Sequence, residues 1–151
     1  MNYSFDDYEA ALLWALNDLA APVGYLKTLK GYAGELDEET ALDNFLRGFP
    51  GVLVEMSEAA YDIATMPFYS QDVTVSLLVG ARSFRSQDEA RGGDTGAFKI
   101  LADLRRRLLG KTLGLEIQPL VIVRESKLAS SPQTVIYLAQ YKFTNDRIEE
   151  K

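Results

Sequence analysis

Three segments of the chain carry apolar residues every three or four positions, the pattern of a helix with one buried face. This spacing predicts helices over about residues 6–20, 38–49 and 95–109, the last of them capped by Asp94 or Thr95. Ser4 followed by Asp7 predicts a capping box at the first helix start. The apolar stripes consist of Phe5, Tyr8, Leu12, Leu16 and Leu19, then Leu42, Phe45, Leu46 and Phe49, then Phe98, Leu101, Leu104 and Leu108. Each stripe is expected to face the core.

Alternating apolar and polar residues predict strands in much of the remaining chain. The strictest alternation covers residues 73–81, and shorter patterns cover 52–57 and 135–143. We also expect a strand around 115–124 and a short, weakly patterned one within 23–32. The segments 52–57 and 73–81 are expected to form an antiparallel pair of strands.

The resulting order is helix, short strand, helix, two strands, helix, two strands. Because helices and strands do not alternate strictly, this order predicts an α+β fold. We expect an antiparallel sheet of four or five strands with three helices, mainly packed on one face. A length of 151 residues fits a single domain spanning residues 1–151. Within it we expect a turn at 67–72, a long loop at 83–96 and a frayed tail at 144–151.

The composition narrows the chemistry available to the chain. It contains no cysteine and no histidine. A thiolate nucleophile, a cysteine zinc site and a histidine general base are therefore excluded, and we expect no cofactor. No apolar run approaches the roughly 20 residues that span a bilayer. The acidic start also lacks the pattern of a signal peptide, so we expect no membrane partner.

Charge is distributed unevenly along the chain. Residues 1–81 contain 3 basic and 13 acidic side chains, whereas residues 82–111 contain 8 basic and 4 acidic ones. This division favours an anionic partner or a copy of the same protein docking head to tail. An uneven but merely solvated surface is the alternative. Because the whole chain carries a net charge of −6, and because few aromatic side chains accompany the basic segment, we expect no sequence-specific nucleic acid as a partner.

Two groups of residues have some features of chemical sites. Residues 91–96 combine an arginine with glycines before a helix start, where backbone N–H groups can bind phosphate. The lysine and hydroxyl residue of a phosphate loop are missing there. The second group is Asp37, Glu38, Glu39 and Asp43, and acids are common at a helix start because the helix dipole favours them. Neither group predicts a catalytic or metal site, so we expect the protein not to be an enzyme.

The segment from Ala81 to Leu120 resembles a family of small proteins from Mu-like phages and prophages. The shared pattern is an arginine–aromatic–arginine loop, acids and an arginine before Gly-Asp, a helix, and a Gly-Leu strand that ends in proline. The residues that carry it are Arg82-Ser83-Phe84-Arg85, Asp88 to Asp94, Gly96 to Leu101, Leu108 to Gly110, Leu113 to Leu115 and Gln118 to Leu120. The strand entry Pro50-Gly51-Val52-Leu53-Val54 is also similar to the family.

The resemblance implies a tail terminator or tail-completion protein, located in the tail or neck of the virion after assembly in the host cytoplasm. Such a protein forms a homo-oligomeric ring, a hexamer, that caps the tail tube of a contractile tail. Its partners would be copies of itself, the tail tube and sheath proteins, and the head connector or neck protein. The family pattern carries no catalytic residues. Three alternatives remain: a neck or head-completion protein, a small nucleotide- or metal-dependent enzyme, and a regulatory module that binds a host protein.

A ring interface needs two different surfaces on each subunit, which the acidic and basic segments can supply. We expect the 83–96 loop to become ordered on the tail tube or on a neighbouring subunit, where its arginines would pair with carboxylates. The predicted interaction residues are Arg82, Arg85, Arg91, Asp94, Arg105, Arg106 and Arg107.

Overall fold

A computed structural model describes residues 1–82, 91 and 96–149 of the chain. The helices are α1 (Phe5–Leu16), α2 (Glu39–Arg47) and α4 (Ala97–Leu108), with a short 3-10 helix, η1 (Asn17–Leu19), directly after α1. The strands are β1 (Thr28–Gly31), β2 (Gly51–Thr65), β3 (Phe68–Arg82), β4 (Val121–Ser130) and β5 (Thr134–Glu149). This order of elements is the one that the sequence predicts.

The five strands form one sheet in the order β1-β2-β3-β5-β4. β1 is parallel to β2, and every other neighbouring pair is antiparallel. The α+β prediction is therefore confirmed, with a parallel strand at one edge of a mostly antiparallel sheet. The parallel pairing arises because α2 lies between β1 and β2 and returns the chain to its starting end.

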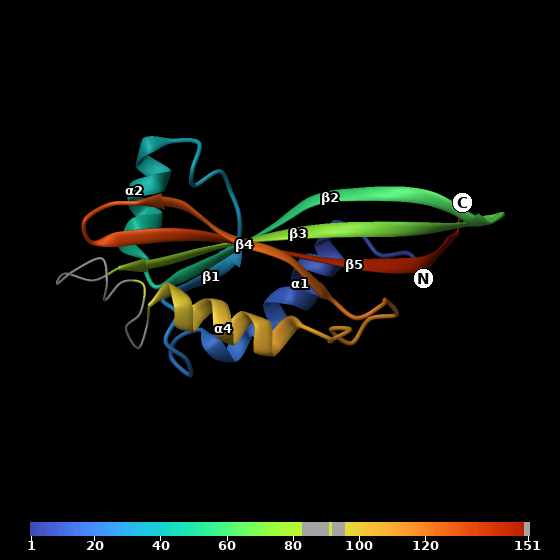
Figure 1. The fold of residues 1–151 in the computed structure, drawn as a ribbon, viewed down its shortest axis with the longest axis horizontal. Coiled ribbons are helices and arrows are strands. Elements are labelled where there is room, and N and C mark those ends of the chain that lie inside the picture. The colour runs from blue at the N-terminus through green and yellow to red at the C-terminus, as the bar shows by residue number, and fades with distance from the viewer. Residues whose placement is uncertain (83–90, 92–95, 150–151) are drawn as a thin grey trace.

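Helices cover both faces of the sheet, but unequally. α1 and α4 lie side by side against one face, and α2 lies against the opposite face at one end of the molecule (Figure 1). In β2, Val52 and Val54 belong to the large core under α1 and α4, whereas Leu53 packs with Phe45 and Phe49 beside α2. This alternation follows from the two-residue period of a strand. Because two of the three described helices, α1 and α4, lie on one face, the prediction that the helices pack mainly on one face is confirmed.

The predicted capping box of α1 is present. The backbone N–H of Asp7 donates to the Ser4 hydroxyl at 3.1 Å, and the backbone N–H of Ser4 donates to the Asp7 carboxylate at 2.8 Å. Two of the predicted core positions are wrong, because Phe5 and Phe98 are exposed. Both lie in the first turn of a helix and outside the buried core, and the Phe98 ring packs edge-on against Tyr137 of β5.

β2 and β3 form a much longer hairpin than the sequence predicts. Each strand has 15 residues, and the predicted turn at 67–72 is wrong for 68–72, which belong to β3. The predicted frayed tail is also wrong for 144–149, because β5 continues to Glu149 and pairs with β3. Backbone pairing along the ladder holds these polar segments extended where the side-chain pattern alone does not mark them. The expected loop at 83–96 lies outside the described residues, apart from Arg91 and Gly96.

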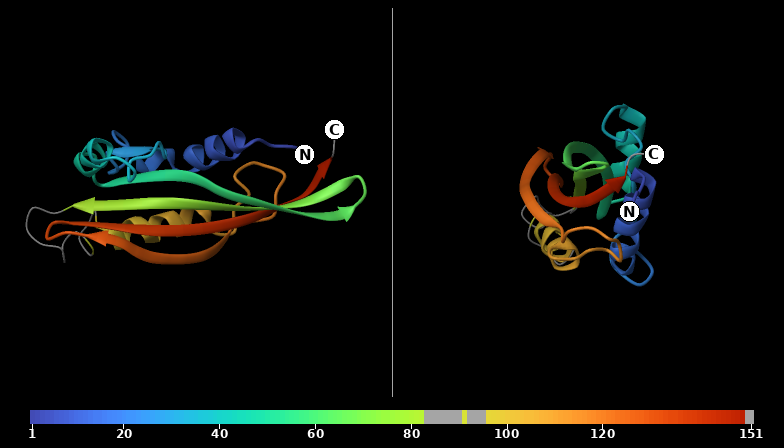
Figure 2. Two further views of the ribbon diagram at one scale, coloured as in Figure 1. Left: turned by 90° about the horizontal axis from the view of Figure 1, so that it is seen from above. Right: turned by 90° about the vertical axis from the view of Figure 1, so that its right-hand side faces the viewer.

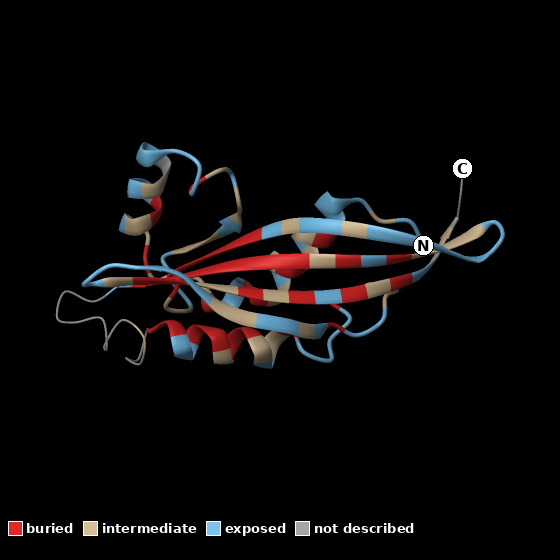
Figure 3. Ribbon diagram, turned by 45° about the horizontal axis from the view of Figure 1, so that its top comes forward, coloured by how far each residue is buried: buried red, intermediate tan, exposed pale blue. Residues whose placement is uncertain are grey.

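The far end of this sheet projects beyond the helices. We call residues 58–65, 68–74 and 142–149 the arm (Figure 2, left). Burial falls along β2 from its start toward the turn, so that this strand is largely exposed within the arm (Figure 3). The base of the arm packs against Tyr8 of α1, whereas its outer end, around the β2–β3 turn, offers sheet surface that no described helix covers.

A buried polar network joins the arm to α1. The Tyr8 hydroxyl donates to Gln71 at 2.6 Å, and the Gln71 amide donates to the Tyr61 hydroxyl at 2.8 Å. Asn145 donates to the Tyr8 hydroxyl at 3.2 Å and to the Met1 carbonyl at 2.7 Å. Burial raises the pKa of the Tyr8 phenol above its ordinary value, so Tyr8 remains a donor. Because satisfied buried networks specify one geometry, this one fixes where the arm leaves the body.

Candidate interaction site

The basic segment that the sequence marks as an interaction site is built on α4. Ile100, Leu101, Leu104 and Leu108 are buried under the sheet. Gly110 follows with a φ of +72°, a conformation that glycine adopts without strain, and it ends the helix as the sequence predicts. With this apolar face fixed, Lys99, Asp103 and Arg106 fall on one flank of the helix.

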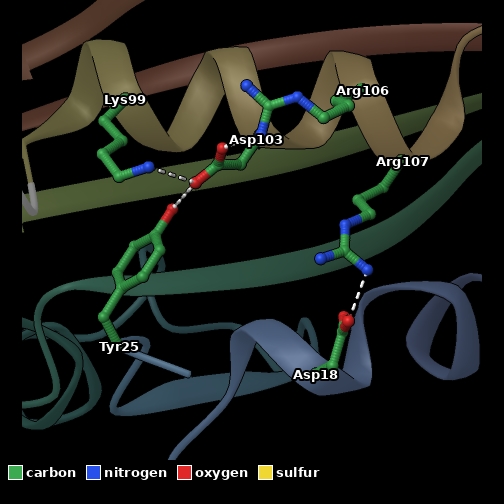
Figure 4. Close-up of polar contacts among 6 residues, drawn as sticks. All are labelled: Asp18, Tyr25, Lys99, Asp103, Arg106 and Arg107. Carbon is green, nitrogen blue, oxygen red and sulfur yellow. Dashed lines mark hydrogen bonds and ion pairs between the residues drawn. The ribbon is translucent and has the colours of Figure 1, made fainter. Parts of the chain in front are cut away.

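Asp103 is the centre of a charged cluster on that flank (Figure 4). The Tyr25 hydroxyl donates to its carboxylate at 2.5 Å, Lys99 donates to the same oxygen at 3.2 Å, and Arg106 donates to the other oxygen at 2.9 Å. Asp103 is buried although it is charged. Burial of a charge is tolerated here because both carboxylate oxygens are hydrogen-bonded and two cations flank them.

The cluster sets the protonation of its members. Burial alone would raise the pKa of Asp103, but the hydrogen bonds from Tyr25 and Lys99 and the charges of Lys99 and Arg106 outweigh it and lower that pKa. Burial, followed by the hydrogen bond to Asp103, raises the pKa of the Tyr25 phenol well above its ordinary value. Asp103 thus stays ionised and Tyr25 stays protonated near neutral pH. General acid–base catalysis requires a group whose pKa lies near the working pH. Neither Asp103 nor Tyr25 meets this requirement, because the pKa of each is shifted away from neutrality.

The two neighbouring arginines bind other parts of the same chain. Arg107 donates to Asp18 of η1 at 2.5 Å (Figure 4). Arg105 makes a bidentate pair with Glu125 of β4, at 2.6 and 2.7 Å. Three consecutive arginines therefore contact three different carboxylates. The Arg107–Asp18 pair joins the basic segment to the acidic one inside the subunit and fastens α4 to η1, whereas the Arg105–Glu125 pair fastens α4 to β4.

The structure brings together only part of the predicted interaction set. Arg105, Arg106 and Arg107 share the end of α4, and Arg106 is the most open of them, with 71% of its side chain exposed. Arg82 ends β3, and Arg91 lies between undescribed segments. Arg85 and Asp94 lie outside the described residues. A joint site made of all seven residues is therefore a hypothesis that the described part of the chain does not test.

Sequence reasoning missed the buried Asp103 and the half-buried Tyr25, the two members at the centre of the cluster. A signal for Asp103 was present, because Lys99 precedes it by four positions and Arg106 follows it by three, the helical spacings of ion pairs. Tyr25 comes from the segment between η1 and β1. Nothing in its local pattern connects it with a helix that begins 72 residues later.

Two features are not found among the described residues: a metal-ligating cluster and a membrane-spanning helix. No three acidic side chains among them gather closely enough to hold a metal ion. None of the helices found in the described ranges has the length and apolar character needed to cross a bilayer.

Residues 7–144 match the protein family described as Bacteriophage Mu, Gp37. The match begins in α1 and ends in β5, so it includes part or all of every helix and strand named above. No curated protein matches the chain.

Proposed function

The chain belongs to the Bacteriophage Mu, Gp37 family, and from this premise we propose that it is the tail terminator of a contractile-tailed phage or prophage. The family confirms the resemblance to Mu-like phage proteins and indicates a structural, tail-related protein rather than an enzyme. In the proposed role, a hexameric ring of subunits caps the tail tube and presents a surface to the head connector.

One observation carries this proposal: the family match extends over 7–144, and therefore over the body, the basic helix and the arm as far as Thr144. The subunit's asymmetry supports it. An arm projects at one end, whereas α2 lies at the other (Figure 1). Unlike surfaces on one subunit favour head-to-tail association, which closes into a ring when the rotation permits.

The charged cluster fits a structural role better than a catalytic one. Asp103 is held ionised and Tyr25 is held protonated by their contacts with each other and with two cations. Such a cluster fixes the position of α4 and leaves Arg106 at the surface. In the proposed ring, Arg106 and the predicted loop arginines would meet carboxylates of a neighbouring subunit or of the tail tube.

A neck protein that joins the connector to a finished tail is the second candidate. The same family membership supports it, because both proteins belong to the junction between head and tail. The two roles differ in one consequence. A terminator stops the growth of the tube, whereas a neck protein acts after tail length has been set.

Deletion of the gene from its phage or prophage, followed by electron microscopy of induced lysates, tests the proposal. We expect unjoined heads beside tails of uncontrolled length, and restoration of uniform tails when the intact gene is supplied in trans. Tails of normal length that fail to join heads would favour the neck role. Normal infectious particles would contradict both.

A further inference from the structure

The sheet has an open edge on each side. On one side, β1 pairs with β2 only as far as Gly31 opposite Val54, and the last hydrogen bond is from the Tyr32 N–H to the Val54 carbonyl, at 2.8 Å. Residues 55–65 of β2 continue beyond this point, and we call them the β2 edge. On the other side, β4 is the last strand of the sheet. No described strand pairs with the β2 edge on that side or with the outer side of β4.

The two edges are similar in length and carry apolar side chains in the open. The β2 edge has 11 residues, and Tyr61 and Ile63 are exposed on it. β4 has 10 residues, and Val121, Val123 and Leu128 are exposed on it. Natural proteins rarely leave long apolar edges unprotected, because such edges pair with other strands. An exposed edge of this kind is therefore typical of an interface.

Charge distinguishes one edge from the other. The β2 edge contains three acids, Glu55, Glu58 and Asp62, and no basic residue. β4 contains Arg124 and Lys127, and its single acid, Glu125, is already paired with Arg105 of the same chain. Each edge repels a copy of itself and attracts the other. This favours a head-to-tail contact over a two-fold symmetric one.

We infer that β4 of one subunit pairs with the β2 edge of the next, so that a second copy of this chain is the occupant of each open edge. This inference rests on the proposed ring and names its interface. The backbone groups of the two edges would complete each other's hydrogen bonds, and the sheet would continue from subunit to subunit.

Strand direction agrees with this pairing. β2, β3, β5 and β4 are successively antiparallel, so β4 runs opposite to β2. If neighbouring subunits keep the same strand direction, as rotation about an axis along the sheet requires, β4 meets the next β2 edge in antiparallel orientation. Antiparallel pairing is the more stable arrangement per residue.

The positions of the two edges along the strand direction also agree with closure of the sheet into a ring. Val121 pairs with Lys142, Lys142 with Thr74, and Thr74 with Glu58, so β4 lies level with the first half of β2. Bringing β4 to the centre of the β2 edge requires a shift of about six residues, or about 20 Å, across a four-stranded width of about 19 Å. These values correspond to a strand tilt of about 46°, at the upper end of the range typical of closed sheets.

Cross-linking tests the contact directly, because the natural chain contains no cysteine. Antiparallel pairing of the two segment centres places Val123 opposite Ile63, and their exposed fractions are 48% and 64%. The double variant Ile63→Cys/Val123→Cys is introduced into the phage or prophage. Tails are then treated with a bis-maleimide whose reach exceeds the strand spacing of about 4.8 Å, which tolerates a small error in register.

We expect the double variant to give a ladder of covalent oligomers on denaturing gels, and each single variant to stay monomeric. The matched control is Trp14→Cys/Val123→Cys, because Trp14 is 67% exposed and lies on α1, outside either edge strand. This pair should give no ladder. If the chain is present on tails but the Ile63→Cys/Val123→Cys pair stays monomeric, or if a single variant links into dimers, the edge pairing is wrong and the terminator role stands. Absence of the chain from tails would overturn the terminator role, and the inference with it.

Charge reversal gives a second test that does not depend on the cysteine variants assembling. Glu58→Lys/Asp62→Lys and Arg124→Glu/Lys127→Glu should each reduce incorporation into tails to background while the purified proteins keep their melting temperatures. The four changes combined should restore incorporation, because attraction across the contact returns with reversed sign. Loss without restoration in the combined variant, with all three proteins folded, would contradict the inferred contact.

Discussion

At the scale of single residues, Asp103 shows how the fold keeps a buried charge. Its carboxylate accepts hydrogen bonds from Tyr25, Lys99 and Arg106. Lys99 and Arg106 are themselves well exposed, so solvent weakens their attraction to it. The hydrogen bond from Tyr25 is the most shielded of these contacts. Loss of the charge would leave the Tyr25 hydroxyl and the two cations without an ionised acceptor.

The Asp103→Asn variant should lower the free energy of unfolding by about 1–3 kcal/mol at pH 7, the usual cost of disrupting a buried hydrogen-bonded group. The pKa of Asp103 is lowered in the folded state. Its contribution is therefore present above the unfolded pKa and is lost as the pH falls through the folded value. The cost of Asp103→Asn should thus shrink between pH 7 and pH 3 in urea unfolding experiments. Asp43→Asn, at an exposed position of α2, is the control, and an equal cost at both pH values would contradict this account.

A glycine near the end of β3 permits close packing by an aromatic ring. A Cβ atom at Gly80 would overlap the ring of Phe49, which follows α2 and also packs edge-on against Phe45. Gly80→Ala should therefore cost about 1–3 kcal/mol through overpacking. In a Phe49→Leu background the same change should cost less, because the clashing ring atoms are gone. Thermal unfolding of the four proteins measures this coupling, and an identical cost in both backgrounds would exclude the clash as the cause.

At the scale of elements, the helices were readable from sequence because each has a regular apolar stripe and a local start or stop signal. Ser4 and Asp7 mark the start of α1, and Gly110 marks the end of α4. The arm was not readable. Residues 58–65 and 68–72 have no buried apolar face, so their strand character comes from pairing with each other and with β5. Such pairing joins residues far apart in sequence and leaves no local pattern.

The candidate site, like the fold, was predicted only in part. The basic residues of α4 were identified from charge alone, but their partners Asp18, Asp103 and Glu125 come from three different elements. The two open sheet edges were also missed, because edge position follows from strand order. Strand order depends on which strands meet in three dimensions and is not written in any one segment.

The anchoring of the arm can be tested with Tyr8→Phe. Removal of this hydroxyl leaves the Gln71 carbonyl oxygen without its donor and Asn145 with one acceptor fewer. We expect faster amide hydrogen exchange at 69–71 and 145–148, with little change at 75–79, because opening free energies are local. Tyr3→Phe is the matched control, since the Tyr3 hydroxyl accepts from Glu116 instead. Uniformly faster exchange across β3 would mean that Tyr8 stabilises the whole sheet and not the arm.

At the scale of the whole molecule, the subunit is elongated and its two ends differ. One end carries the arm, with the N-terminus and the end of β5 nearby, and the other carries α2 (Figures 1 and 2). The sheet runs between these ends with an acidic edge on one side and a basic edge on the other. A subunit of this shape suits a ring in which every copy makes the same two unlike contacts.

The most direct measurement is the position of the protein on tails purified from a phage that cannot make heads. Affinity-purified antibodies against the chain, coupled to gold, would locate it by electron microscopy. A terminator should label one end of each free tail and no other part of it. Label along the length of the tail, or on heads alone in the corresponding tail-deficient lysate, would contradict the terminator role.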